Sequence, residues 1–189
     1  MRPEIAGNPF GAIVVLPNPL HPAIVHFPIV LVFLLPIFAI GALWAIRRGS
    51  AVRRAWAIPV AFSAALALSA WAAVQTGESQ GDKVEDIVPG NAMDKHEDAA
   101  ELFLNLSGVL VLVTAAGFAP GVIGRSARIV AAAGAVAMVA VGANVGNSGG
   151  ELVYVHGAAS AYAQPNATRV GDANASVPVP LKEGARREH

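Results

Sequence analysis

The stretch from Leu20 to Ile46 holds the longest run of apolar side chains in the sequence. No polar or charged side chain occurs between Phe27 and Ile46. A helix of about 20 residues spans roughly 30 Å, the thickness of the hydrocarbon core of a bilayer. A core helix of a soluble domain normally keeps a polar face, which this run lacks. The pattern therefore predicts a transmembrane helix over residues 20–46.

Three further apolar stretches follow, and each is long enough to cross a bilayer. We expect helices over 55–75, 101–124 and 129–146. Short arginine-containing turns would join the first helix to the second and the third to the fourth, and a polar loop would join the second to the third. Four spans with short connections predict an all-α, integral membrane four-helix bundle of up-down-up-down topology, in which the first and third helices are diagonal partners.

Three segments are expected from these patterns. Residues 1–19, rich in proline and glycine, form an N-terminal segment at the outer face, and residues 20–157 form the four-helix transmembrane domain. From residue 158 to 189 the chain is alanine, asparagine, proline and charge without periodicity, which predicts a disordered outer-face tail.

Composition supports a membrane environment and excludes several kinds of site. Of the 189 residues, 54% are hydrophobic and only 14% charged, whereas about a quarter are charged in a soluble domain. The formal net charge of +0 gives no field to recruit nucleic acid. The chain has no cysteine, which excludes disulfides, thiolate metal sites, iron–sulfur clusters and covalently attached haem.

The distribution of charge predicts the orientation in the membrane. The two short turns carry only basic residues: Arg47, Arg48, Arg53 and Arg54 in one, Arg125 and Arg128 in the other. Short arginine-rich loops stay on the cytoplasmic side. Both termini and the acidic loop between the second and third helices are therefore expected outside.

Four histidines, His21, His26, His96 and His156, fall near helix ends on the predicted outer side. An ionisable residue within an apolar helix is a functional candidate. His21 and His26 are five residues apart, roughly 140° around a regular helix, so they would not share a face. We expect His26 to point inward and His96, on the diagonal helix, to oppose it. Two imidazoles from facing helices suit a b-type haem that is held without cysteine.

Two alternatives stay open at this point. The four histidines His21, His26, His96 and His156 could instead surround a copper or zinc ion, with Glu78, Asp98 and Glu151 accepting hydrogen bonds from the imidazoles. Each histidine could also be an interfacial residue that bonds a loop carbonyl, in which case the chain would be a cofactor-free scaffold subunit of a larger membrane complex. No nucleophile–base arrangement indicates a self-contained enzyme.

Four pieces of the sequence together resemble a bacterial membrane-protein family, domain of unknown function 2231, which has four predicted spans. They are HPAIVHFPI at residues 21–29, QTGE at 75–78, His96, and GGELVYVHG at 149–157, and the resemblance covers residues 20–157. It implies a multi-pass protein of the bacterial cytoplasmic (inner) membrane, with His21, His26, His96 and His156 as the characteristic histidines. Some relatives are joined to Rieske-type or cytochrome c modules, which implies a redox setting.

Together these observations predict a small integral membrane subunit that binds haem b at the outer, periplasmic face and acts in electron transfer. This chain carries no redox module of its own. Its expected partners are the lipid bilayer and either a larger redox or membrane complex or a separate outer-face electron carrier.

Overall fold

The computed structural model describes residues 19–162, and within that range it contains helices and no strand. The predicted all-α four-helix bundle is confirmed. The elements, in chain order, are α1 His21–Ile24, α2 His26–Arg47, α3 Val52–Gly81, α4 Gly90–Ala116, α5 Gly121–Tyr154 and the short 3-10 helix η1 Ala158–Tyr162.

The first span is interrupted at Val25, between α1 and α2. Pro28 has no N–H to donate to the carbonyl of Ile24, so one helical hydrogen bond cannot form there. The backbone bonds on either side persist: Val25 N donates to His21 O at 3.1 Å and Ile29 N to Val25 O at 3.2 Å. The two helices therefore make one continuous span, His21–Arg47, close to the predicted 20–46.

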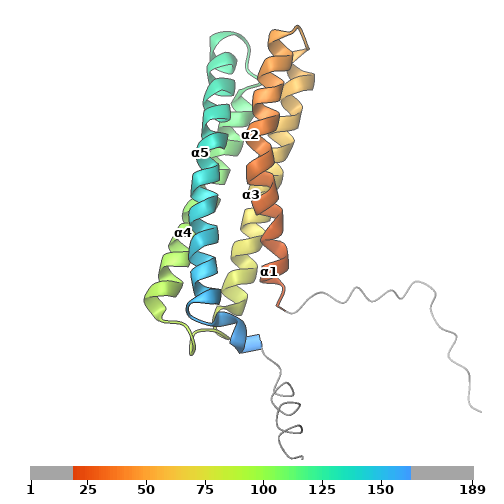
Figure 1. Cartoon of the computed structure of the whole chain (residues 1–189). Coiled ribbons are helices and arrows are strands. Elements are labelled where there is room, and N and C mark those ends of the chain that lie inside the picture. The colour runs from red at the N-terminus through yellow and green to blue at the C-terminus, as the bar shows by residue number, and fades with distance from the viewer. Residues whose placement is uncertain (1–18, 163–189) are drawn as a thin grey trace, which may run out of the picture.

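The four long helices pack around one core (Figure 1). Helix α2 contacts α3 and α5, and α4 contacts the same two helices, whereas no contact joins α2 to α4 among the described residues. These two are therefore diagonal, as predicted. The centre of the core is formed by apolar side chains, with alanine prominent where helices approach closely: Val32, Leu35, Ala39, Trp56, Leu66, Ala70, Phe103, Leu110, Ala131, Ala135 and Met138.

The two ends of the bundle differ in chemistry. Turns 48–51 and 117–120 lie together at the top of Figure 1, and we call this the arginine end after Arg47, Arg48, Arg53, Arg54 and Arg125. The other end holds α1, the start of α4 and the last turns of α3 and α5. We call it the histidine end after His21, His96 and His156.

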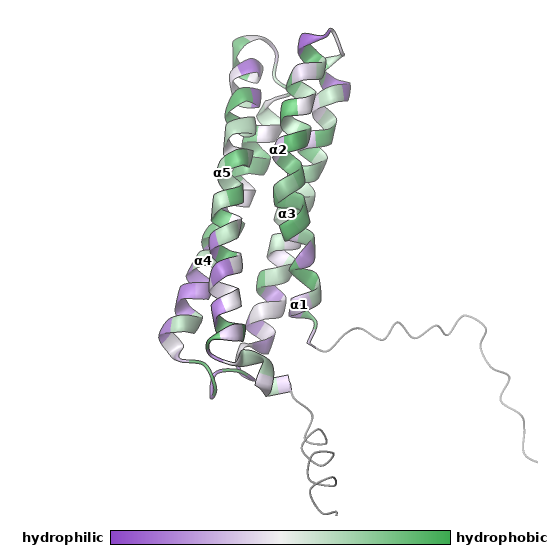
Figure 2. Cartoon of the chain, in the orientation of Figure 1, coloured by the Kyte–Doolittle hydropathy of each residue, from purple (hydrophilic) through white to green (hydrophobic). Residues whose placement is uncertain are grey.

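The outside of the bundle is apolar over most of its length (Figure 2). Large side chains such as Ile37 (64% exposed) and Leu112 (72% exposed) face outward, where water would penalise them but lipid would not. The four candidate spans contain 27, 30, 27 and 34 residues, and about 20 suffice to cross a bilayer. The chain is a multi-pass membrane protein.

The helices extend further than the apolar runs predicted. Helix α3 continues to Gly81 instead of ending at Gln75, and α5 covers Gly121–Tyr154 instead of 129–146. The third helix differs most, because α4 runs from Gly90 to Ala116 instead of 101–124. Polar side chains are compatible with a helix beyond the hydrocarbon, where water can solvate them. His96, predicted to precede this helix, therefore lies inside it.

A buried tryptophan closes the arginine end. Trp56 is 0% exposed, and its Nε1 donates to the carbonyl of Thr114 at 2.8 Å. Arg128, predicted to lie in a turn, is instead buried within α5 and donates to the carbonyl of Gly117. The connecting turn lies at 117–120, earlier in the chain than the predicted 125–128, and the arginine side chain helps to seal it.

The first residues of the segment predicted as a disordered tail form a short helix instead. Ala158–Tyr162 forms η1, which is fixed by Tyr162: its hydroxyl donates to Gln80 Oε1 at 3.3 Å, and Lys83 Nζ lies 5.7 Å from its ring centroid. The rest of the predicted tail, 163–189, and residues 1–18 of the N-terminal segment lie outside the described residues.

Gly117 is a position at the arginine end where an added methyl group should be harmful. Its Cβ would lie 2.2 Å from Trp56 Nε1 and 2.9 Å from Arg128 Cγ. We predict that Gly117→Ala lowers the free energy of unfolding by about 1–3 kcal/mol, the usual cost of overpacking. Thermal unfolding in detergent, followed by circular dichroism, measures it.

Gly41→Ala is the matched control, because a Cβ there meets nothing within 4 Å. It should leave stability unchanged or raise it. Equal melting temperatures for Gly117→Ala and Gly41→Ala would contradict the packing described at the arginine end.

Candidate functional site

His21, in α1, is held against the last turns of α3. Its half-buried imidazole places Nδ1 2.8 Å from the carbonyl oxygen of Ala73 and 3.2 Å from Thr76 Oγ1. A carbonyl oxygen only accepts hydrogen bonds, so Nδ1 carries the proton. In the neutral ring, Nε2 then holds a lone pair.

His96, in the second turn of α4, is held in the same manner against α5. Its Nδ1 lies 2.9 Å from Ser148 Oγ, and that hydroxyl donates its own hydrogen to the carbonyl of Val145 at 3.0 Å. Because the single hydroxyl hydrogen is already used, Ser148 accepts from Nδ1–H. Nε2 of His96 is again the unprotonated nitrogen.

Both Nε2 atoms remain available at the histidine end. Neither has a hydrogen-bond partner among residues 19–162, and in the same residues no buried side-chain nitrogen or oxygen lacks one. Each Nε2 therefore keeps some surface that a water molecule can reach. Histidines that bind metals usually donate their other ring N–H to a carbonyl or similar acceptor, which fixes the tautomer and orients the ring. Each imidazole is thus prepared as a ligand.

Two glycines allow this close approach. A Cβ at Gly77 would lie 3.1 Å from Cε1 of His21, and a Cβ at Gly149 would lie 3.0 Å from Cε1 of His96. Both distances are tighter than ordinary van der Waals contacts. Any larger residue at either position would press on the imidazole beside it.

Both imidazoles occupy the histidine end, and they come from the two diagonal sides of the bundle. Each ring is bonded to the long helix beside it, His21 to α3 and His96 to α5. His21 and His96, rather than His26 and His96, are therefore the two histidines whose rings are bonded between helices at this end.

His26 does not point inward, which corrects the orientation expected from the sequence. Its side chain is exposed, whereas that of His21 is half-buried. The prediction that the two do not share a face is consistent with this difference. The five-residue spacing places the two side chains on different faces, but it does not decide which of the two faces the bundle.

His156 follows α5 and is half-buried, with its backbone N–H donating to the carbonyl of Glu151 at 3.2 Å. Within residues 19–162 no group of three or more histidine or acidic residues is arranged to hold a metal ion. The geometry thus gives no support to a four-histidine site.

The carboxylates expected to orient the imidazoles are engaged elsewhere or exposed. Glu78 accepts from Gln75 Nε2 at 3.2 Å, Glu151 pairs with Lys95 at 2.8 Å, and Asp98 is exposed. Among the described residues none of the three bonds to a histidine ring. The orienting groups are the backbone carbonyls and hydroxyls given above. Sequence reasoning missed Thr76 and Ser148, although each directly precedes a glycine near the end of its helix.

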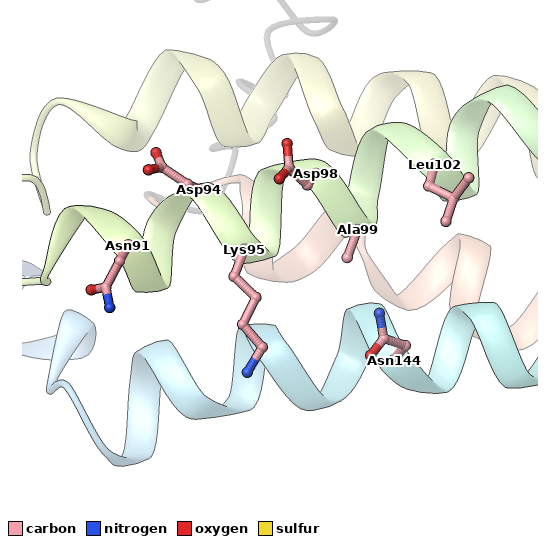
Figure 3. Close-up of a pocket in the computed structure, with 7 residues that line it drawn as sticks. All are labelled: Asn91, Asp94, Lys95, Asp98, Ala99, Leu102 and Asn144. Atoms are coloured by element: carbon pink, nitrogen blue, oxygen red, sulfur yellow. The ribbon is translucent and has the colours of Figure 1, made fainter.

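An open hollow lies on the outer side of α4 and α5 (Figure 3). Lys95 extends from α4 toward α5, where its Nζ meets Glu151 Oε2. No histidine lines this hollow, so it is separate from the imidazole pair. Its lining is Asn91, Asp94, Lys95, Asp98, Ala99, Leu102 and Asn144.

Comparisons of the chain with protein-family models, with curated proteins and with solved structures give no match. The resemblance noted from the sequence therefore stays a prediction, and the functional argument depends on the geometry of the site.

The different surroundings of His21 and His26 predict different costs of removal. His21→Ala should lower the free energy of unfolding by about 1–3 kcal/mol, because it removes a hydrogen-bonded, partly buried side chain. His26→Ala, at an exposed position, should change it by less than about 0.5 kcal/mol. Both are measured by thermal unfolding in detergent. A larger loss for His26→Ala would mean that His26, and not His21, packs inside the bundle.

Proposed function

We propose that this protein is a small integral membrane subunit that holds one b-type haem at the histidine end, between His21 and His96, and serves in electron transfer. One observation carries the proposal: two imidazoles from diagonal sides of a four-helix bundle each have Nδ1 engaged and Nε2 accessible. Facing helices of a bundle commonly supply the ligands of a cofactor in its core.

The donor set fits the iron of a haem. Two neutral imidazoles are a common pair of axial ligands, and haem b needs no cysteine. The chain has none. His21 takes the place that the sequence suggested for His26, because the His26 side chain is exposed.

The surroundings of the imidazoles would tune such a site. Bound haem supplies a reversible one-electron centre. Donation from Nδ1–H to Ala73 and to Ser148 raises the basicity of each imidazole. A more basic ligand favours oxidised iron, so these contacts would lower the reduction potential of a haem held there. A partner at the same end, either a separate carrier protein or a larger membrane complex, would exchange electrons with it.

A single copper ion is the second candidate. It is favoured by the close packing of Gly77 and Gly149 on the imidazoles, which suits a small ion, and by the affinity of imidazole for copper. Zinc fits less well, because structural zinc usually takes four protein ligands and no group of three or more histidine or acidic residues is assembled within residues 19–162.

An optical spectrum tests the haem proposal. The full chain, expressed with added haem precursor and purified in detergent, should give a Soret band and the sharp reduced-minus-oxidised bands of a low-spin bis-imidazole haem. His21→Ala and His96→Ala should each abolish the low-spin form, whereas His26→Ala and His156→Ala should keep it.

Three other outcomes are informative. Loss of the low-spin form in His26→Ala but not in His21→Ala would restore the ligand pair predicted from the sequence. Stoichiometric copper without iron in elemental analysis would support the second candidate. Absence of both haem and metal, with co-purification of a larger complex, would indicate a scaffold subunit.

A further inference from the structure

The buried positions of α2 recur in α4 at a constant separation. In four pairs, both members are buried and the second lies 75 residues after the first. The pairs are Pro28 and Phe103, Val32 and Ser107, Leu35 and Leu110, and Ala39 and Thr114.

The buried positions of α3 recur in α5 in the same way, with a separation of 72 residues. The pairs are Trp56 and Arg128, Pro59 and Ala131, Ser63 and Ala135, and Leu66 and Met138. The two separations differ by three residues because the second half is shorter at its connection. From Ala39 to Trp56 the chain advances by about 17 residues, and from Thr114 to Arg128 by about 14.

A periodic core alone would not establish a repeat, since any two buried helices can be aligned at several shifts of about seven residues. The histidine contacts provide an independent check. His96 lies 75 residues after His21, the separation of the first helices. Thr76 and Ser148 are 72 residues apart, as are Gly77 and Gly149, which is the separation of the second helices.

The chemistry of the two sets also matches. In each, a histidine near the start of the first helix of its half donates to an oxygen on the second helix, where a backbone carbonyl, a hydroxyl and a glycine occur at positions i, i+3 and i+4. In the first half these are Ala73, Thr76 and Gly77. In the second half they are Val145, Ser148 and Gly149. We call each set, with its histidine, a clamp.

We propose that the chain consists of two repeated halves related by a pseudo-twofold axis along the bundle, and that the two clamps are equivalent positioning devices for one shared ligand between His21 and His96. Parallel repeats with an axis along the membrane normal occur in other membrane proteins, which place their ligand site at the interface of the repeats. Thr76, Gly77, Ser148 and Gly149 are then positioning residues, because they act through the imidazoles.

This inference builds on the pairing of His21 with His96 in the proposed function, but the clamps can be tested without haem. In the full chain labelled with 15N-histidine, in detergent and free of haem, long-range 1H–15N NMR correlations show which ring nitrogen carries the proton. Single His→Gln variants assign the signals. Both His21 and His96 should be protonated on Nδ1. Protonation of either ring on Nε2 would overturn the inference.

Four variants test the equivalence. Thr76→Val and Ser148→Ala each remove one hydroxyl, and Gly77→Ala and Gly149→Ala each press a Cβ on one imidazole. In the haem-free spectrum, each should shift the ring signals of its own histidine.

Ser79→Ala is the control for the hydroxyls, because Ser79 also donates to its own helix, at Thr76 O, but is exposed. Gly81→Ala and Gly146→Ala are the glycine controls, since a Cβ at either meets nothing within 4 Å.

Haem b titration supplies the second readout. Removing a group that orients a ligand usually lowers affinity about 10- to 100-fold, so Thr76→Val and Ser148→Ala should each do so, and both should move the reduction potential in the same direction. The control variants should bind as the unsubstituted chain does.

If one clamp variant weakens haem binding and the other leaves it unchanged, the halves are not equivalent and the inference fails while the haem proposal stands. If the unsubstituted chain binds no haem but both tautomers and all four ring shifts are as expected, the clamps stand and the haem proposal fails.

Discussion

Donation of each imidazole Nδ1–H to the neighbouring helix is the interaction on which the histidine end depends. It fixes the tautomer, turns Nε2 away from the helix that accepts the bond, and ties α1 to α3 and α4 to α5. It depends in turn on the length of α3 and α5. Only because α3 and α5 continue beyond their apolar runs do Thr76 and Ser148 reach the level of the histidines.

The two ends of the bundle solve different physical problems. At the arginine end, Trp56 fills the space beside Gly117 and the buried Arg128 uses a backbone carbonyl, so the end is sealed by packing. At the histidine end, the contacts between helices are polar and leave two ring nitrogens accessible. Between them the outer surface is apolar, as lipid requires. The proposed electron-transfer site lies at the histidine end, where these ring nitrogens are.

The sequence predicted the parts of this structure that the solvent dictates. Lipid demands apolar side chains around a helix, so the number of helices and the span at 20–46 could be read directly. The start of α4 at Gly90 could not, because beyond the hydrocarbon a helix carries polar residues and looks like a loop. The choice between His21 and His26 depends on which face of the first span packs on α3, and the spacing of the two histidines does not fix that face. Thr76 lies in the QTGE piece and Ser148 directly precedes the GGELVYVHG piece, but nothing in the sequence links the two hydroxyls, and their correspondence emerges only when the buried register of both halves is known.

The most direct test of a site shared by His21 and His96 is a titration of the 15N-histidine-labelled chain with ferric haem b, followed by NMR. Both ring signals should disappear or shift together and reach completion at one haem per chain, while those of His26 and His156 persist at or near their original positions. A response of only one of the two imidazoles, separate stoichiometries for the two, or a response of His26 in place of His21 would contradict a single shared site.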